Sequence, residues 1–279
     1  MVNFRTTVAT KIAQKGDYMS YYSKLLKDII AVEKKAGKII LSAKNIERTN
    51  KLNVHDIVTQ YDKAVQKVIF ETLSKKYPHI KVIGEEENLG DKIDPYKGEV
   101  FIVDPIDGTS NFINGLNESA ISIGYVVDGV PTVGVVYNPY RKELFTAIKG
   151  CGAKCNGQSI NVNNLELKQG LVGYGTAVYY DELIQKTQKA FCDVLLKAND
   201  VRRIGSAALD ICALAKGRFC AFYEMRLCPW DYAAGMVILT EAGGVITDIE
   251  GNPVSLKEKS SVCAGNNIAY NELKEILNS

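Results

Sequence analysis

The chain has 279 residues, of which 46% are hydrophobic and 24% charged, and its formal net charge is +2. This composition is typical of a folded, soluble protein of one large or two ordinary domains. It argues against a nucleic-acid-binding protein, because the sequence has no block of Lys and Arg. It also argues against a membrane protein, because no apolar run reaches the roughly 18 residues that a spanning helix requires.

The seven cysteines are an odd number and include no Cys-x-x-Cys motif, which favours reduced thiols in a cytoplasmic protein. The closest pair, Cys151 and Cys155, lies in the turn-like stretch KGCGAKCNG without a nearby His, so we expect no zinc site there. The N-terminal stretch MVNFRTTVATKIAQKGD has no apolar core like that of a signal peptide. We therefore expect a cytoplasmic location.

The first part of the chain is expected to carry helices and then strands. Residues 1–16 are polar and weakly patterned, which predicts a loosely held N-terminal extension. A helix is predicted from a cap at Asp17 to about residue 45, and a second ends near Lys76, just before Pro78. The later segments are predicted strands, and the residues around Asp128-Gly129 read as a hairpin turn. These segments are HIKVIGEEE, EVFIVD, AISIGYVVDGVPTVGVVYNP and KELFTAIKG.

Helices and strands alternate in the rest of the chain. Helices are predicted over 181–198 and 206–216, and an apolar helix over WDYAAGMVILTEAGG closes at Gly243 and Gly244. Short strands are expected at FCAFYE, GVITDI and SVCAGN, followed by a terminal amphipathic helix at YNELKEIL. The first half of the sequence reads as helices followed by a run of strands, and the second half as alternating helices and strands. The Gly- and Asn-rich stretch near residues 155–165 therefore predicts a boundary between an N-terminal α+β half over 17–158, with an antiparallel sheet, and a C-terminal α/β half over 159–279.

Three apolar segments run directly into carboxylates. Val82-Ile83-Gly84 precedes the acidic run 85–87, Phe101-Ile102-Val103 precedes Asp104 and Asp107, and Pro229-Trp230 precedes Asp231. Each could be ordinary: a solvated acidic run, a turn rich in Asp, Pro and Gly, and a helix N-terminal acid. Together, in a chain with only two His, they favour a hard-cation site with oxygen ligands. Converging carboxylates would repel one another without a cation, and Mg²⁺ suits such a site.

The segment DPIDGTSNF at 104–112 combines several useful features. Pro105 stiffens the link between Asp104 and Asp107, which would let them hold adjacent metal ions at a fixed spacing. Gly108 allows a ligand to approach the backbone, and a short helix opening at Thr109 would present N–H groups to a phosphate. One segment could thus supply both metal ligands and a phosphate cradle.

These motifs resemble the signatures of the inositol monophosphatase family, a group of lithium-sensitive, magnesium-dependent phosphatases, in the form found in bacteria. The matching segments are GEE at 84–86, DPIDGTSNF at 104–112, GSAALD at 205–210, WDYAAG at 230–235 and EAGG at 241–244. They occur in the family's order, and the resemblance spans roughly residues 18–277.

The resemblance implies roles for individual residues. The metal ligands would be Glu85, Asp104, Asp107, Asp231 and the carbonyl of Ile106. The residues acting on the catalytic water would be Glu85, Thr109 and Asp62, with Lys51 on a mobile loop near the metals. The substrate side would be formed by Gly108, Thr109, Gly205, Ser206, Ala207, Glu224, Arg226 and Asp231. From the residues alone, Lys51 reads as a loop lysine and Glu224 as a surface acid at a strand end.

Two positions depart from the best-known animal members. Cys228 stands where those proteins carry His, and it cannot form the same hydrogen bonds at neutral pH. Arg226 occupies a position that is often small. If it points inward it could pair with Glu224 or accept a second phosphate, and if it points outward it is a solvated surface arginine. These departures bear on the substrate rather than on activity.

The resemblance implies a mixed α/β fold of alternating α-β-α-β-α layers, of the inositol monophosphatase and fructose-1,6-bisphosphatase type. The implied reaction is hydrolysis of a small phosphate monoester, with inositol 1-phosphate as the leading candidate. Two or three Mg²⁺ ions would activate a water for direct in-line attack. Alternatives of the same fold act on fructose 1,6-bisphosphate, nucleotide 3′-phosphate, NADP or histidinol phosphate, and an inactive metal- or ligand-binding relative is a further possibility. We also expect a homodimer, lithium sensitivity, and no nucleic-acid or membrane partner.

Overall fold

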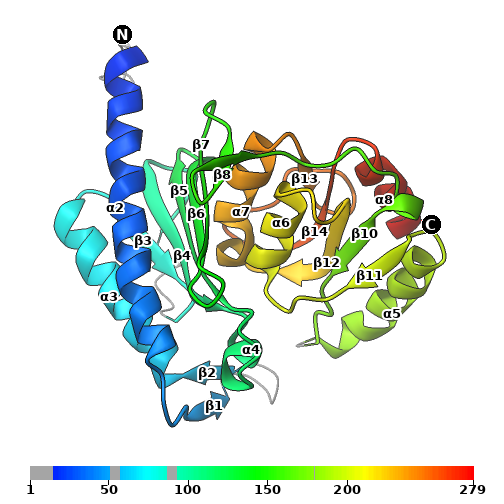
Figure 1. The fold of residues 1–279 in the computed structure, drawn as a ribbon, viewed down its shortest axis with the longest axis horizontal. Helices are drawn as coiled ribbons and strands as arrows, with labels where there is room; N and C mark the ends of the chain where they lie inside the picture. Colours follow the sequence, from blue (N-terminus) through cyan, green and yellow to red (C-terminus); the bar gives the residue numbers. More distant parts are fainter. Residues whose placement is uncertain (1–14, 51–56, 87–92, 179) are drawn as a thin grey trace.

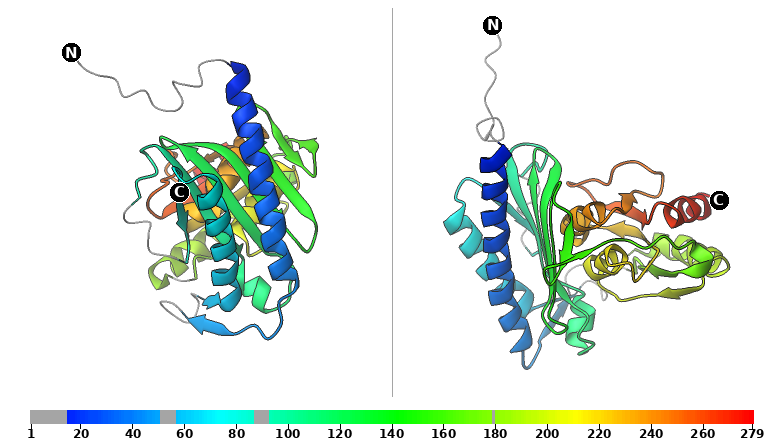
Figure 2. Two further views of the ribbon diagram at one scale, coloured as in Figure 1. Left: turned by 90° about the vertical axis from the view of Figure 1, so that its left-hand side faces the viewer. Right: turned by 45° about the horizontal axis from the view of Figure 1, so that its top comes forward.

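Layers of helix and sheet alternate in the computed structural model, which describes residues 15–50, 57–86, 93–178 and 180–279. Two helices cover a large sheet, two more lie between this sheet and a smaller one, and two cover the far side (Figures 1 and 2). The described helices are α2 (Lys15–Leu41), α3 (Gln60–Lys76), α4 (Thr109–Ile113), α5 (Asp181–Leu195), α6 (Ala207–Ala215), α7 (Pro229–Glu241), α8 (Ala269–Leu277) and the 3₁₀ turn η2 (Leu167–Gln169). The expected α-β-α-β-α layering is confirmed.

The larger sheet has seven strands in chain order, and only its first pair is parallel. These strands are β3 (Lys81–Gly84), β4 (Glu99–Asp107), β5 (Ala120–Val127), β6 (Val130–Asn138), β7 (Glu143–Ile148), β8 (Ala153–Cys155) and β9 (Gln158–Ile160). β5 and β6 form the predicted hairpin, in which Asp128 and Gly129 adopt φ angles of 48° and 78°. Positive φ at both central residues is the requirement of a two-residue hairpin turn of type I′.

The smaller sheet is mixed and runs in the order β11-β10-β12-β14-β13. Its strands are β10 (Leu171–Tyr174), β11 (Asp200–Arg202), β12 (Ala221–Leu227), β13 (Val245–Thr247) and β14 (Ser260–Gly265). A separate two-stranded ribbon joins β1 (Arg48–Asn50) to β2 (Ile57–Thr59). Along β12, Phe222 packs toward α6 and α7, whereas its neighbours Ala221 and Tyr223 pack in the cluster with α5 and α8, as strand alternation requires.

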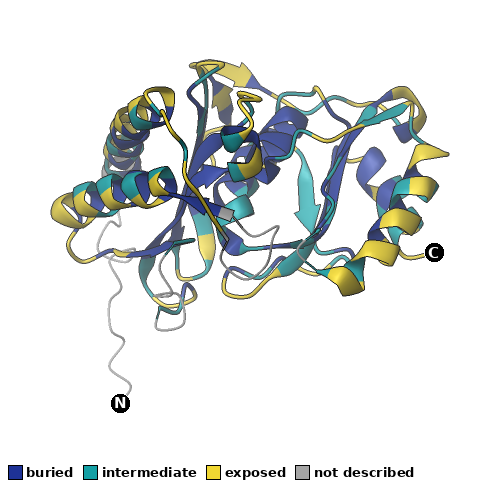
Figure 3. Cartoon of the chain, turned by 90° about the horizontal axis from the view of Figure 1, so that it is seen from below, coloured by how far each residue is buried: buried dark blue, intermediate teal, exposed yellow. Residues whose placement is uncertain are grey.

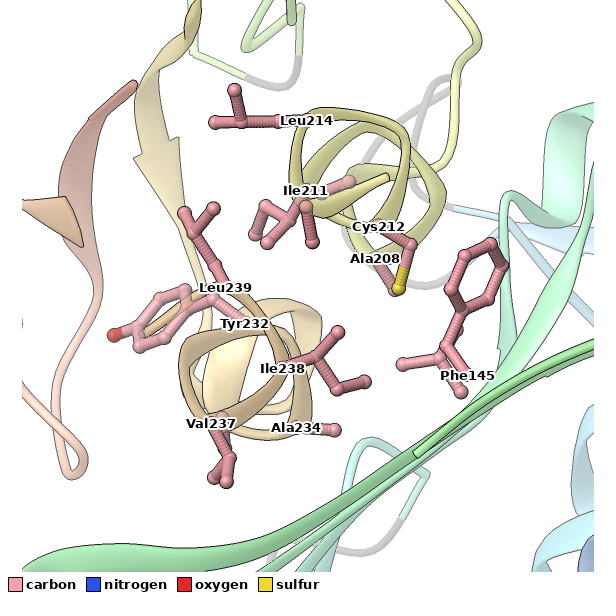
Figure 4. Close-up of a cluster of buried hydrophobic side chains, with 14 of the residues drawn as sticks. Phe145, Ala208, Ile211, Cys212, Leu214, Tyr232, Ala234, Val237, Ile238 and Leu239 are labelled. Carbon is pink, nitrogen blue, oxygen red and sulfur yellow. The ribbon is translucent and has the colours of Figure 1, made fainter. Parts of the chain in front are cut away.

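Helix α7 is apolar on all sides because it lies between the two sheets. In Figure 3 the helices between the sheets are dark blue, whereas the outer helices alternate between buried and exposed positions. Figure 4 shows side chains of α6 and α7 in one cluster, with Phe145 of β7 reaching it from the larger sheet. A Cβ atom at Gly124 would lie 3.0 Å from Ala233, and one at Gly134 would lie 2.3 Å from the Ala234 carbonyl oxygen. Glycine therefore allows α7 to lie directly against β5 and β6.

Three predicted boundaries were wrong. Helix α2 begins at Lys15, so Asp17 lies in its first turn rather than at its cap, a position that also favours an acid. The same helix ends at Leu41 rather than near residue 45, and Asn45 has a φ of +50°, which a right-handed helix cannot continue. Strand β4 runs on through Pro105 to Asp107, because the ladder with β5 shifts register between Asp104 and Asp107 and a bulge tolerates proline.

One chain segment connects the two sheets, and one hydrophobic cluster lies between them. The chain passes from β9, which ends at Ile160, to β10, which begins at Leu171, close to the predicted boundary. Because α7 from the C-terminal part packs on β5 and β6, the division into halves at residue 158 stays a prediction. Residues 1–14 of the predicted extension lie outside the described residues. Within the described residues, no helix has the length and apolar character needed to cross a membrane.

Candidate active site

Three aspartates from two elements meet at one point. Asp104 and Asp107 come from the bulged end of β4, and Asp231 comes from the first turn of α7. One carboxylate oxygen from each lies within 4.8 Å of the others. Asp104 is 2% and Asp107 8% exposed. The bulge places both β4 carboxylates in this cluster, which a regular strand would not do for residues three apart.

Backbone and hydroxyl donors fix each of these carboxylates. Asp104 Oδ1 accepts from the Ile106 amide at 3.0 Å, and Asp231 Oδ2 accepts from the Cys228 amide at 2.7 Å. Asp107 Oδ2 accepts from the Ser206 hydroxyl at 2.5 Å and the Ala208 amide at 2.7 Å. Each aspartate uses one of its two oxygens for these bonds, and the two Asp107 bonds tie β4 to the start of α6.

The cluster is electrostatically unfavourable as it stands. Burial, together with neighbouring carboxylates, raises the pKa of Asp104 and of Asp231 well above the usual range. Burial raises the pKa of Asp107 to about 6, although the Ser206 and Ala208 donors oppose this. A divalent cation held by these oxygens would remove the repulsion, and an all-oxygen donor set suits Mg²⁺. The residues present therefore fit the metal that the sequence predicts.

Asp62 and Thr109 form a second polar group beside the aspartates. Asp62 belongs to a capping box at the start of α3, in which it accepts from the Thr59 amide at 2.8 Å and from the Thr59 hydroxyl. The Thr109 hydroxyl lies 3.3 Å from Asp62 Oδ1 and 3.0 Å from the Ile106 carbonyl oxygen. Burial raises the pKa of Asp62 to about 6, and the nearby Glu85 carboxylate adds to this effect.

Glu85 is brought to the same place by strand pairing. β3 runs parallel to β4 with Gly84 opposite Val103, so Glu85 and Asp104 follow the paired positions. Glu85 is half-buried and its charge contributes to the raised pKa of Asp104. Parallel neighbouring strands that end at one edge thus account for the predicted meeting of these two acids.

The residues predicted around the phosphate also come together. Gly108 has a φ of +86°, and a Cβ there would lie 2.9 Å from the Glu118 carbonyl oxygen and 3.1 Å from that of Gly205. Ser206 caps α6, since its hydroxyl accepts from the Leu209 amide at 3.3 Å. Ala207 is the first residue of that helix, next to the donors that hold Asp107. The turn before α4 and the start of α6 therefore face each other.

The structure places Glu224 and Arg226, two further residues predicted on the substrate side, in different surroundings. Glu224, on β12, accepts from the Ala177 amide at 3.2 Å, and burial raises its pKa to about 7. Arg226 does not pair with Glu224; it binds Glu182 at 2.7 Å. Lys51 lies outside the described residues, so its predicted role stays a prediction.

Two site residues were missed by the sequence reasoning. Asn111 is buried, and its amide donates at 2.8 Å to the carbonyls of both Glu118 and Ile204, which joins the α4 turn to the segment before α6. Asp210 is buried on α6, and its Oδ1 has no hydrogen-bond partner among the described residues. Burial, with Glu224 nearby, raises the pKa of Asp210 well above the usual range. Both residues lie within the quoted motifs, so a closer look at DPIDGTSNF and GSAALD could have found them.

A family model described as the inositol monophosphatase family matches residues 22–279. The chain belongs to the inositol monophosphatase family. The predicted resemblance is confirmed, and the family is metal-dependent, in agreement with the acidic cluster.

Relatives in this family carry two kinds of name. "Nus factor SuhB" of Pasteurella multocida is 38% identical over 260 residues, covering 91% of this chain and 94% of that protein. "Inositol-1-monophosphatase" of Bacillus subtilis is 37% identical over 217 residues, covering 77% and 81%. The staphylococcal SaIMPase-II, solved with inositol monophosphate bound, has a TM-score of 0.78 and 33% identity, covering 90% of this chain and 92% of that chain. The same protein has also been solved with 2′AMP bound.

The cluster of aspartates predicts a pH-dependent response to Mg²⁺. Asp62 and Asp107 have pKa values raised to about 6 in the folded state, so the folded protein holds their protons more tightly than the unfolded chain does. Their contribution to the free energy of unfolding is therefore fully present below their unfolded pKa. It is lost as pH rises from about 4 through 6. We expect Mg²⁺ to bind the ionised carboxylates, so it should raise the melting temperature by about 5 °C at pH 7.5 when near 100 times its Kd.

Thermal unfolding with Mg²⁺ or with EDTA, at pH 5 and pH 7.5, measures this effect. The Mg²⁺-induced shift should be clearly smaller at pH 5, because protons compete for the same oxygens. K⁺ at matched ionic strength controls for general salt effects. A shift equal at both pH values would contradict binding at these carboxylates.

Proposed function

We propose that this protein hydrolyses a small phosphate monoester, with inositol 1-phosphate as the leading candidate and two or three Mg²⁺ ions as cofactors. The observation that carries the proposal is the cluster formed by the buried Asp104 and Asp107 and the half-buried Asp231, in which one oxygen of each residue lies within 4.8 Å of the others. Such a cluster is costly unless cations and a phosphate complete it. Family membership and the inositol monophosphate bound to a staphylococcal relative support the choice of substrate class.

The three aspartates would hold the metal ions, and Glu85 and the Ile106 carbonyl would add oxygen ligands. Bound Mg²⁺ would supply a water of lowered pKa and positive charge for the phosphate oxygens. The proposed path is direct in-line attack by water, without a covalent enzyme intermediate. No nucleophile with an adjacent base stands out among the described residues of the cluster, where burial also raises the pKa of the Cys228 thiol.

Thr109 would orient the attacking water. Its single hydroxyl hydrogen is directed to the Ile106 carbonyl or to Asp62, at 3.0 and 3.3 Å. Its oxygen can therefore act only as an acceptor toward a water molecule. Glu85, on the neighbouring strand, would share this role, and Asp62 holds the hydroxyl in place.

The Thr109→Ala variant should lower kcat by about 10²-fold, because the attacking water would lose the group that accepts its hydrogen bond. The variant should leave KM within about twofold. Steady-state phosphate release with inositol 1-phosphate measures both constants. Thr109→Ser keeps the hydroxyl and should retain most of the wild-type kcat. A Thr109→Ala protein with raised KM and unchanged kcat would assign Thr109 to substrate binding instead.

The substrate side is expected to recognise the hydroxyl groups of a polyol or sugar. Glu224 is a carboxylate that can accept hydrogen bonds from two hydroxyls, and it lies near Asp107, whose charge contributes to its raised pKa. The family resemblance assigns Gly205, Ser206 and Ala207 to the neighbouring wall. Cys228 is a weaker hydrogen-bonding partner than His, which favours loose discrimination among polyols, and sugar bisphosphates, nucleotide 3′-phosphates, NADP and histidinol phosphate remain alternatives.

A non-catalytic role is the second candidate, because a relative that covers nearly the whole chain is named Nus factor SuhB. The intact set of carboxylates favours catalysis. A Mg²⁺-dependent phosphate-release assay over a panel of esters separates the two functions. Release with Mg²⁺ that is abolished by EDTA supports the proposal, and no release from any ester of the panel overturns it. The homodimer, the cytoplasmic location, lithium sensitivity and the absence of a nucleic-acid partner stay predictions.

A further inference from the structure

Two buried side chains hold the backbone of Ile204 beside the candidate site. Asn111 Nδ2 donates a hydrogen bond to the Ile204 carbonyl oxygen at 2.8 Å, and the Ile204 amide donates one to the Asp210 carboxylate. Asn111 is 6% and Asp210 2% exposed, so water does not compete effectively for either bond. Asn111 belongs to α4 and Asp210 to α6, so the backbone of Ile204 links these two helices.

Gly205, the next residue, fits closely between the two sides of the site. It has a φ of +85°, and a Cβ on it would lie 3.0 Å from Asn111 Nδ2. Its carbonyl oxygen lies 3.1 Å from the position that a Cβ on Gly108 would take. Gly205 is thus confined between Asn111 and the turn before α4. Because Gly205 joins Ile204 directly to the start of α6, a displacement of Ile204 would move the first residues of that helix.

The first residues of α6 in turn hold Asp107. The Ser206 hydroxyl and the Ala208 amide donate to Asp107 Oδ2 at 2.5 and 2.7 Å and leave Oδ1 to the proposed metal ion. Hydrogen-bond partners of this kind fix the direction of a metal-binding carboxylate. Asn111 Nδ2 also donates at 2.8 Å to the Glu118 carbonyl oxygen, on the segment that leads into β5. Asn111 therefore ties the start of α6 to the larger sheet, which carries Asp107.

We propose that Asn111 and Asp210 are positioning residues, which hold Ile204 and thereby direct Asp107 toward the metal ions. This inference rests on the proposed function, in which neither residue is a ligand of the metal or of the substrate. Both would act through the backbone of residues 204–208. Oδ1 of Asp210 has no hydrogen-bond partner among the described residues, so residue 210 needs to supply only one acceptor.

A matched pair of variants at residue 210 separates positioning from charge. Asp210→Asn keeps an oxygen that can accept from the Ile204 amide, whereas Asp210→Leu keeps only a similar volume. Asp210→Leu should raise the Kd for Mg²⁺ alone, measured by calorimetry, by about tenfold, and it should lower kcat for phosphate release by about 10–100-fold. Asp210→Asn should stay within about threefold of wild type in both quantities. Equal losses in the two variants, or unchanged Mg²⁺ binding by Asp210→Leu, would overturn the inference.

The variant Asn111→Asp keeps the shape of the side chain and removes both NH₂ hydrogens. An added negative charge would by itself tighten Mg²⁺ binding, so a Kd raised by about tenfold would report the lost hydrogen bonds. Asn114→Asp adds the same charge at an exposed position on the same segment and is the matched control, with no loss expected. Tighter or unchanged Mg²⁺ binding by Asn111→Asp would contradict the positioning role.

The binding measurement also keeps this inference separate from the proposed function. If wild type released no phosphate from any ester, the proposed function would fall, and the Mg²⁺ affinities of the variants would still decide the role of Asn111 and Asp210. Absence of Mg²⁺ binding by wild type would overturn the positioning role itself. Thermal unfolding checks that each variant is folded, and Asp210→Ala replaces Asp210→Leu if the latter is not.

Discussion

Replacing Asp107 by Asn should leave the protein folded and lower kcat by about 10³-fold, equivalent to roughly 4 kcal/mol of transition-state stabilisation. The Asn carbonyl oxygen can still accept from the Ser206 hydroxyl and the Ala208 amide, the bonds that tie β4 to α6. The Asn amide nitrogen then takes the place of Asp107 Oδ1 and presents a neutral NH₂ group to the proposed metal ions. The fold is kept, and the metal ligand is lost.

The same variant should respond differently to metal and pH. Removing one charge from the cluster relieves repulsion, so without Mg²⁺ the variant should unfold at a higher temperature than wild type at pH 7.5. It should also show little stabilisation by Mg²⁺. Asp193→Asn, on the exposed side of α5, is the matched control. Near wild-type turnover by Asp107→Asn at saturating Mg²⁺ would remove Asp107 from the metal site.

Replacing Gly134 by Ala should destabilise the protein by about 3 kcal/mol, or a fall in melting temperature of roughly 6–12 °C. The added Cβ would lie 2.3 Å from the Ala234 carbonyl oxygen, and a backbone atom of a buried helix cannot move aside cheaply. Displacement of α7 would also displace Asp231, so kcat should fall by about 10²-fold. Thermal unfolding and phosphate release on the same preparation measure the two effects.

Gly150→Ala is the control for the glycine substitution itself. Gly150 has a φ of +80° with open space around its Cβ position, so Ala there carries backbone strain without a steric contact. Its cost should stay near 1–2 kcal/mol, and kcat should not change. If Gly134→Ala were no more destabilising than Gly150→Ala, the close contact between α7 and β6 would be incorrect.

Local patterns predicted the elements whose signals are short-range. The Asp128-Gly129 hairpin, the end of α3 near Lys76 and the apolar character of α7 follow from turn chemistry, helix stops and periodicity. The meeting of Glu85 with Asp104 also follows from two apolar runs that each end in an acid. The hairpin, the helix end and the apolar helix depend on residues close in sequence, whereas the meeting of Glu85 with Asp104 also requires β3 to pair with β4.

Features that depend on tertiary contacts were harder to predict from the sequence. The bulge that extends β4 to Asp107 depends on its pairing with β5, and the direction of Arg226 depends on Glu182 and Tyr180, 44 and 46 residues away. The sequence reasoning left that direction open for this reason. Asn111 and Asp210 resemble ordinary polar residues until the fold buries them. Family motifs supplied the remaining site residues, and their individual roles stay predictions.

The direct contact of α7 with β5 and β6 has a consequence for the dynamics of the site. Asp231 is carried by a helix that cannot separate from the larger sheet without exposing the core between the two sheets. Amide protons of α7 should therefore exchange with solvent as slowly as those of β5, by global unfolding alone. Under the proposed function, the ester would enter and phosphate would leave through motions of surface segments, because α7 and the larger sheet are packed against each other.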